Sequence, residues 1–126
     1  MQTEALLALV QGELNERKAL DLTVLDVRGK TSFTDYMIVV TGTSNRHLKA
    51  LCDYVEIKVK ENGIMPLGME GDMNSDWVLL DIGDVIVHAM TKQARDYYQL
   101  EKLWSVSGAG FDGAANSSQA SLEISA

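Results

Sequence analysis

The sequence contains one cysteine, Cys52, and one proline among its 126 residues. A single cysteine excludes an internal disulfide and a cysteine-based zinc site, and it is typical of a protein kept in a reducing compartment. No run of about 18 apolar residues occurs, so the sequence predicts no membrane-spanning helix. The first ten residues lack a basic start and include Glu4, so we expect no signal peptide and a cytoplasmic location.

Positive charge is also scarce, since 11 Lys and Arg residues stand against 18 Asp and Glu residues, for a net charge of -7. Proteins that hold nucleic acid need clustered Lys and Arg to neutralise phosphates, so we expect little direct nucleic-acid binding. No Lys or Arg occurs between Lys60 and Lys92. The acidic residues in this segment are Glu61, Glu70, Asp72, Asp76, Asp81 and Asp84. The acidic segment is either a solvated surface or a docking surface for a basic protein.

The length and the 46% hydrophobic content suit one folded domain and exclude wholesale disorder. Residues 105–126 differ in composition, with six Ser, five Ala and three Gly and no Lys, Arg or Pro. Such a segment buries too little apolar surface to offset the entropy lost on ordering. We therefore predict a domain at residues 1–104 and a disordered tail at residues 105–126.

Apolar residues spaced three and four apart predict two long helices. Thr3 is expected to cap the first helix, and Ser44 is expected to cap the second, which Gly63 ends. The apolar stripes of the two helices are Leu6, Leu7, Val10 and Leu14, and Leu48, Leu51, Cys52, Val55 and Val59. Thr91 is expected to cap a short last helix that reaches Tyr98.

Five strands are predicted, at residues 22–27, 36–41, 65–69, 77–80 and 85–90. The uninterrupted run from Tyr36 to Thr41 indicates a strand buried on both faces, whereas Pro66 indicates an edge strand. The connection between the last two strands is short enough for a hairpin. The order α-β-β-α-β-β-β-α predicts an α+β (α/β two-layer) domain, with a mixed sheet of about five strands flanked by helices.

Candidate catalytic and metal-binding residues are few. Ser44 and His47 have the spacing of a nucleophile and a base, but a serine before a helical run is far more often a cap. Cys52 and His88 are distant in sequence, and each is expected in the core, one in a helix stripe and the other in a β-branched strand. We therefore expect no catalytic residue, no metal and no cofactor.

One enzyme hypothesis stays open beside this expectation. A strand, the turn Gly42-Thr43-Ser44 and a helix resemble the start of a nucleotidyltransferase site, which needs two metal-binding carboxylates on the next strand. The next predicted strand, at residues 65–69, contains none. The enzyme hypothesis would use Gly42, Ser44 and the carboxylates of Asp81 and Asp84, although these two acidic residues are more readily explained as stabilising the hairpin turn.

Trp77 begins a strand directly after an acidic loop. Large aromatic residues are usually core residues, but at the rim of a sheet Trp and Tyr are also common interface anchors, and both roles stay open. The two-residue period of a strand places Trp77, Leu79 and Asp81 on one face. An anchor and an acidic residue could therefore act together.

Short motifs along most of the chain resemble the ribosomal silencing factor family, RsfS, also called Iojap or YbeB. They are Asp26-Val27, Asp35-Tyr36-Met37, Thr41-Gly42-Thr43-Ser44-x-Arg46-His47, Pro66-Leu67-Gly68-x-Glu70-Gly71, Asp76-Trp77-Val78-Leu79-Leu80-Asp81-x-Gly83-Asp84-Val85-x-Val87-His88 and Tyr98-x-Leu100-Glu101-x-Leu103-Trp104. The last two are the most specific, and the resemblance covers about residues 1–104.

The resemblance implies a non-enzymatic protein that binds the large ribosomal subunit through ribosomal protein fourteen, blocks joining of the small subunit and represses translation. It also implies a fold distantly similar to nucleotidyltransferases, and a homodimer when free. Together with the acidic segment it points to a partner-binding surface on the hairpin and the C-terminal element. The candidate residues are Trp77, Leu79, Asp81, His88, Arg95, Tyr98 and Leu103, with Trp77 and Tyr98 as anchors and Asp81 as the charged contact.

Overall fold

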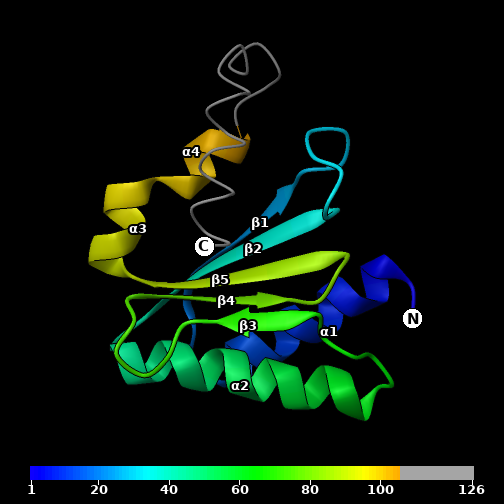
Figure 1. The fold of residues 1–126 in the computed structure, drawn as a ribbon, viewed down its shortest axis with the longest axis horizontal. Coiled ribbons are helices and arrows are strands. Elements are labelled where there is room, and N and C mark those ends of the chain that lie inside the picture. Colours follow the sequence, from blue (N-terminus) through cyan, green and yellow to red (C-terminus); the bar gives the residue numbers. More distant parts are fainter. Residues whose placement is uncertain (106–126) are drawn as a thin grey trace.

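A five-stranded mixed sheet lies at the centre of the computed structural model, which describes residues 1–105 (Figure 1). The strands are β1 (Leu20–Asp26), β2 (Tyr36–Gly42), β3 (Gly68–Glu70), β4 (Trp77–Asp81) and β5 (Val85–Thr91). Their spatial order is β1-β2-β5-β4-β3, in which β2 and β5 pair in parallel and the other neighbours pair antiparallel. The helices are α1 (Thr3–Glu16), α2 (Asn45–Glu61), α3 (Lys92–Tyr98) and α4 (Leu100–Ser105).

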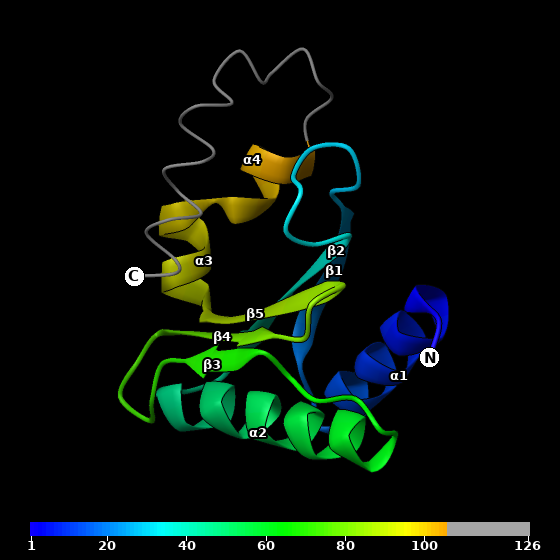
Figure 2. The same cartoon turned by 45° about the vertical axis from the view of Figure 1, so that its right-hand side comes forward.

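The helices cover both faces of the sheet, so the core has two parts (Figure 2). Alternate residues of β2 divide between them: Ile38 and Val40 face α1 and α2, whereas Met37 and Val39 face α3 and α4. The second part contains Leu25, Val27, Met37, Val39, Met90, Ala94, Leu100 and Trp104. A β2 strand buried at every residue confirms the prediction made from its apolar run.

The predictions for α2 are also confirmed. Its buried residues are Leu48, Leu51, Cys52, Val55 and Val59, the predicted stripe. The Ser44 hydroxyl accepts a hydrogen bond from the His47 amide at 3.1 Å, as an N-cap does. Gly63 follows the helix with a φ of +81°, which a residue without a Cβ adopts easily, and its amide donates to the Lys60 carbonyl.

Two predictions at the N-terminal side are wrong. Gln2, and not Thr3, occupies the N-cap of α1, and the Thr3 hydroxyl donates instead to the Asp84 carboxylate at 3.2 Å. β1 begins at Leu20, before the predicted start, since Leu20 pairs with Thr41 of β2, and the pairing then shifts between Leu20 and Thr23. Asp21 has a φ of +49° within this irregularity, which lets the strand continue past it.

Two further boundaries differ from those predicted. The third strand is β3 and not residues 65–69, because its ladder with β4 begins at Gly68. Leu67, directly before it, contributes one hydrogen bond, from its amide to the Asp81 carbonyl at 2.8 Å. The C-terminal element consists of two helices, because Gln99 between them adopts a left-handed backbone conformation.

The remaining sequence predictions concern the ends of the chain. Apart from Ser105, the predicted disordered tail lies outside the described residues, and the division at residue 104 stays a prediction. In the described part of the chain, no helix combines the length and apolar character needed to cross a bilayer.

Candidate partner-binding surface

Strand β4 presents three of the predicted residues on one side. Trp77, Leu79 and Asp81 are half-buried, whereas Val78 and Leu80 between them are fully buried in the core that faces α1 and α2. This alternation confirms that the three share a face. Asp81 also stabilises the turn to β5, since its Oδ1 accepts a hydrogen bond from the Gly83 amide at 2.9 Å.

An aromatic cluster of Trp77, Tyr97 and Tyr98 lies where β4 approaches α3. The ring centroids of Trp77 and Tyr98 are 4.6 Å apart, and those of Tyr97 and Tyr98 are 5.0 Å apart in an edge-on arrangement. Tyr98 is 50% exposed and Tyr97 is 80% exposed. Such an exposed aromatic surface, backed by packed side chains, is suited to anchoring a protein partner.

His88 lies behind Trp77 and not at the surface, because only 1% of it is exposed. Its Nδ1 accepts a hydrogen bond from the Trp77 indole N–H at 3.1 Å. Burial lowers the pKa of His88 to about 3, so the imidazole is neutral at physiological pH and its proton resides on Nε2. His88 therefore fixes the orientation of the Trp77 ring from inside the sheet.

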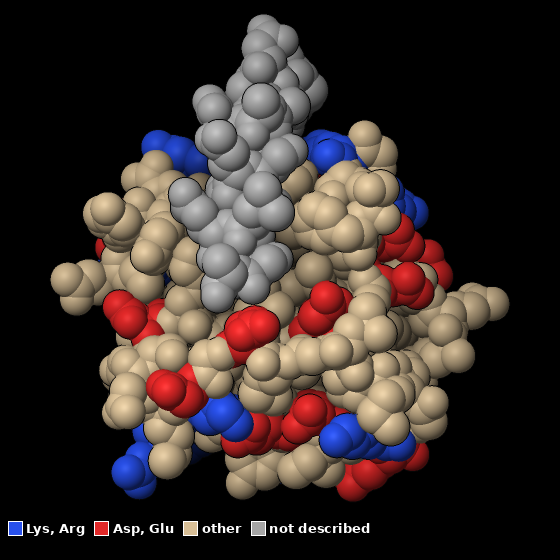
Figure 3. Space-filling model, in the orientation of Figure 1, with Lys and Arg blue, Asp and Glu red and all other residues tan. Residues whose placement is uncertain are grey.

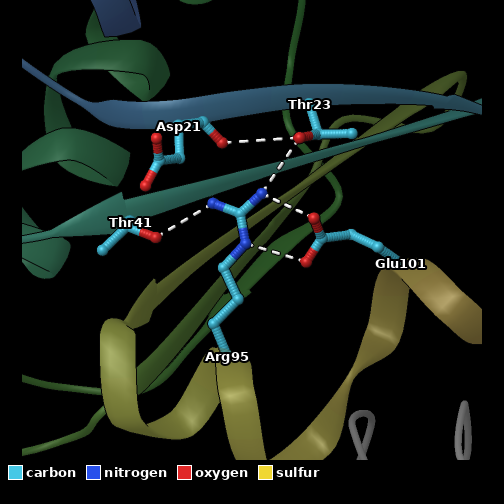
Figure 4. A network of polar contacts seen from close by, with 5 residues as sticks. All are labelled: Asp21, Thr23, Thr41, Arg95 and Glu101. Carbon is cyan, nitrogen blue, oxygen red and sulfur yellow. Dashed lines mark hydrogen bonds and ion pairs between the residues drawn. The ribbon is translucent and has the colours of Figure 1, made fainter.

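Arg95 is likewise directed into the protein (Figure 4). Its side chain is 11% exposed and donates hydrogen bonds to Thr23 on β1, Thr41 on β2 and Glu101 on α4. The hydrogen bonds from Arg95 lower the pKa of the Glu101 carboxyl, which is therefore ionised at neutral pH. The guanidinium thus has most of its donors bound within the chain.

The predicted residues accordingly form a group around Trp77 and a second group, Arg95 and Leu103, whose side chains pack inward. Trp77 contacts both His88 and Tyr98, and Leu79, which pairs with His88, continues this surface toward Asp81. Leu103 packs against the core beneath α3 and α4. Tyr97 is a member of the aromatic cluster that sequence reasoning missed, although its position beside Tyr98 was the available signal.

Acidic residues adjoin this surface, since Asp76 directly precedes Trp77 and Glu70 of β3 is paired with Leu79 of β4. Figure 3 shows Asp and Glu crossing the middle of one face of the molecule, with Lys and Arg at its upper and lower margins. In the acidic segment, Glu61, Glu70, Asp72, Asp76 and Asp84 are exposed. None of the segment's carboxylates forms an ion pair with any described residue. Their charge is therefore available to a partner.

The serine and histidine that suggested catalysis have structural contacts. The Ser44 hydroxyl caps α2, while Nδ1 of His47 accepts from the Thr43 amide at 3.0 Å and Nε2 lies 2.9 Å from the Arg17 carbonyl. The turn Gly42-Thr43-Ser44, which resembled the start of a nucleotidyltransferase site, is closely packed against α2, because a Cβ on Gly42 would lie 2.5 Å from Cδ2 of Leu48. Within residues 1–105, no three His, Cys, Asp or Glu side chains gather as metal ligands would.

Comparison with known proteins gives the family. Residues 1–124 match the RsfS family, described as "Ribosomal silencing factor during starvation". The chain belongs to the RsfS family. This match extends past Trp104, where the motifs recognised in the sequence end. The ribosomal silencing factor RsfS of Haemophilus influenzae is 44% identical over 101 residues, which are 80% of this chain and 99% of that protein.

Solved structures agree with the fold. A crystal structure from Chromobacterium violaceum has a TM-score of 0.80 and 43% identity, covering 83% of this chain and 88% of the other. One from Bacillus halodurans has a TM-score of 0.73 and 33% identity, covering 81% and 95%. The predicted α+β fold with a five-stranded mixed sheet is thereby confirmed. RsfS proteins are non-enzymatic silencing factors of the ribosome, so the nucleotidyltransferase alternative is rejected, and membership implies binding to the large subunit.

Proposed function

We propose that this RsfS protein represses translation by binding ribosomal protein fourteen on the large subunit and so preventing the small subunit from joining. The observation that carries the proposal is the contact between Trp77 and Tyr98, which holds a half-exposed aromatic surface beside unpaired acidic residues. Ribosomal proteins are basic, so this combination of anchor and charge suits one of them better than naked RNA.

The two kinds of side chain would contribute differently to binding. Trp77 and Tyr98 would supply most of the affinity by filling a pocket in the partner, since a few aromatic residues carry most of the energy of an interface. The acidic residues around them would steer the basic partner and fix its orientation. Asp81 is the proposed charged contact, because Oδ1 is bound to the Gly83 amide and the other oxygen has no hydrogen bond to a described residue.

The protein would block subunit joining by occupying the face of the large subunit that meets the small subunit. A folded domain seated on the face that meets the small subunit excludes that subunit sterically, and no chemical reaction is required. The ribosome meant here is the cytoplasmic one, in keeping with the location expected from the sequence. The free protein is proposed to be a homodimer, for which sedimentation equilibrium should give twice the 13.8 kDa mass of the chain.

Sedimentation with purified ribosomal subunits tests the proposal. The protein should co-sediment with large subunits and not with small subunits, and adding it first should reduce the formation of complete ribosomes. Immobilised protein should retain purified ribosomal protein fourteen, but not a second large-subunit protein of equal basicity. The second protein is the necessary control, because an acidic chain attracts basic proteins in general. The proposal would be contradicted if the two ribosomal proteins were retained equally. It would also be contradicted if the protein co-sedimented with neither the large nor the small subunit.

A further inference from the structure

The joint between α3 and α4 has a backbone conformation that its residue does not favour. Gln99 has φ and ψ of +49° and +47°, in the left-handed region that residues with a Cβ rarely adopt. Its amide donates to the Arg95 carbonyl at 3.0 Å. A conformation of this kind persists where surrounding contacts hold it.

The Arg95 side chain supplies those contacts on both sides of the joint (Figure 4). Nε and Nη2 bind the two oxygens of Glu101, on α4, at 2.8 and 2.7 Å. Nη1 donates to the Thr41 hydroxyl at 2.9 Å, and Nη2 donates to the Thr23 hydroxyl at 3.0 Å. One planar group therefore ties α3 and α4 to two strands, with the bidentate geometry that makes Arg–carboxylate pairs strong.

The pairing irregularity in β1 brings its threonine into this network. Asp21, with a φ of +49°, lies in that irregularity, and its carbonyl accepts from the Thr23 hydroxyl at 3.4 Å. The hydroxyl proton of Thr23 thus points to Asp21, which leaves an oxygen lone pair for Arg95. Together these hydrogen bonds give four of the five guanidinium N–H donors a partner, so the joint is supported from the strands and from α4.

Tyr98 is the residue directly before the joint. It is the last residue of α3, and its ring packs on Trp77, which lies on a different element. The direction of its side chain therefore depends on how α3 is held against the sheet. Arg95, three residues earlier on the same helix, is the only residue of α3 with side-chain hydrogen bonds to the strands in the described structure.

We propose that Arg95 is a positioning residue that locks the α3–α4 joint and so keeps Tyr98 stacked on Trp77 before the partner arrives. This inference rests on the proposed function for its effect on binding, but not for its effect on the free protein. A side chain held in its bound position loses less conformational entropy on association, so the lock raises affinity without touching the partner.

A double-mutant cycle on binding to purified large subunits tests the lock. Arg95→Met should weaken binding about tenfold in the wild-type background, a size typical of lost preorganisation. In a Tyr98→Ala background the same substitution should weaken binding less than about twofold, because the ring that it positions is gone. Equal losses in the two backgrounds would overturn the proposal, since Arg95 would then act independently of Tyr98.

Lys92→Met is the matched control. Lys92 lies on the same helix and pairs with Asp96 at 3.4 Å, but the two side chains are 84% and 68% exposed. Its removal deletes a cation from α3 without opening the joint, so binding should change less than about twofold. A loss as large as that of Arg95→Met would show that the charge of α3 matters, and not the lock, and would overturn the proposal.

Nuclear Overhauser contacts between the rings of Trp77 and Tyr98 test the lock in the free protein. They should be present in the wild type and in Lys92→Met, and weakened or lost in Arg95→Met. Glu101→Gln replaces the carboxylate that Arg95 binds with a neutral amide, and it is the substitute if Arg95→Met does not fold. It should weaken the same contacts between the rings. Undiminished contacts in a folded variant would overturn the proposal. If Arg95→Met loses the contacts between the two rings, but the wild-type protein does not bind ribosomes, the result would support the positioning role of Arg95 and refute the proposed function.

Discussion

The indole N–H of Trp77 on β4 donates to Nδ1 of His88 on β5 across 3.1 Å. The pair lies diagonally across the hairpin, because Trp77 is opposite Met90 and His88 is opposite Leu79. His88 can accept this bond only while Nδ1 carries no proton, and burial keeps the ring neutral. A buried neutral base thus orients the aromatic residue that we place at the centre of the partner-binding surface.

The pH dependence of stability should report this neutral histidine. The pKa of His88 is lowered to about 3 in the folded protein, whereas in the unfolded chain it is near 6.5. Between these values the unfolded state binds more protons, so stability falls as the pH decreases below about 6.5. From pH 7 to pH 5 this amounts to about 2 kcal/mol. Urea unfolding at both pH values measures it.

His88→Gln is the control for that measurement. Glutamine keeps a hydrogen-bond acceptor for Trp77 but does not titrate in this range. The variant should lose less stability than the wild type between pH 7 and pH 5, and the difference isolates His88 from other groups. The same pH dependence in both proteins would show that His88 is not buried as described.

Cys52 should be unreactive in the folded protein. It lies within the buried stripe of α2, and burial raises its pKa to about 12. At pH 8 only about one thiol in ten thousand would be ionised, and the thiolate is the reactive form. Labelling by a thiol reagent should be at least about 1,000-fold slower in native protein than in urea. Rapid labelling without denaturant would contradict the placement of α2 against the sheet.

A pair of glycine substitutions tests the packing at the turn before α2. Gly42→Ala should destabilise the fold by about 1–3 kcal/mol, because the new Cβ would lie 2.5 Å from the Leu48 side chain. Gly12→Ala is the contrast, since nothing lies within 4 Å of a Cβ there and alanine favours helix, which should add about 0.5–1 kcal/mol. Urea titrations of both variants should therefore move in opposite directions, and two neutral substitutions would argue against this packing.

Salt should weaken binding to the large subunit moderately. If acidic residues meet a basic protein, raising the ionic strength screens their attraction. From 50 to 200 mM salt we expect a loss of about tenfold or less, against about 10³–10⁵ for a protein that neutralises many phosphates. Dissociation constants at the two concentrations decide this. An affinity indifferent to salt would remove the electrostatic part of the account, and a phosphate-like decline would indicate RNA as the partner.

The parts of the fold that the sequence predicts are those fixed by local patterns. The stripe of α2, its Ser44 cap and the buried run of β2 each depend on residues a few positions apart. The parts it does not predict depend on distant residues. Thr3 is expected to cap α1 from its neighbours alone, but its hydroxyl donates a hydrogen bond to Asp84, 81 positions away.

The candidate surface divides in the same way. The shared face of Trp77, Leu79 and Asp81 follows from the two-residue period of a strand, so the sequence predicts it. Arg95 donates hydrogen bonds to Thr41 and Thr23, which are 54 and 72 positions away, and no local pattern predicts these contacts. An exposed role for Arg95 is the natural expectation for a charged residue on a short helix until its partners are seen.

The central claim is that Trp77 and Tyr98 anchor the protein to the large ribosomal subunit. Binding of Trp77→Ala to purified large subunits measures it most directly, with Tyr98→Ala beside it. Tyr54→Ala is the control, because Tyr54 is an exposed aromatic residue of α2, which packs on the other face of the sheet. We predict a loss of about 2 kcal/mol or more, ~30-fold, for Trp77→Ala, a loss for Tyr98→Ala and none for Tyr54→Ala. A Trp77→Ala protein that loses the ~3–5 kcal/mol of a core truncation, yet binds as tightly as the wild type while folded, would contradict the claim.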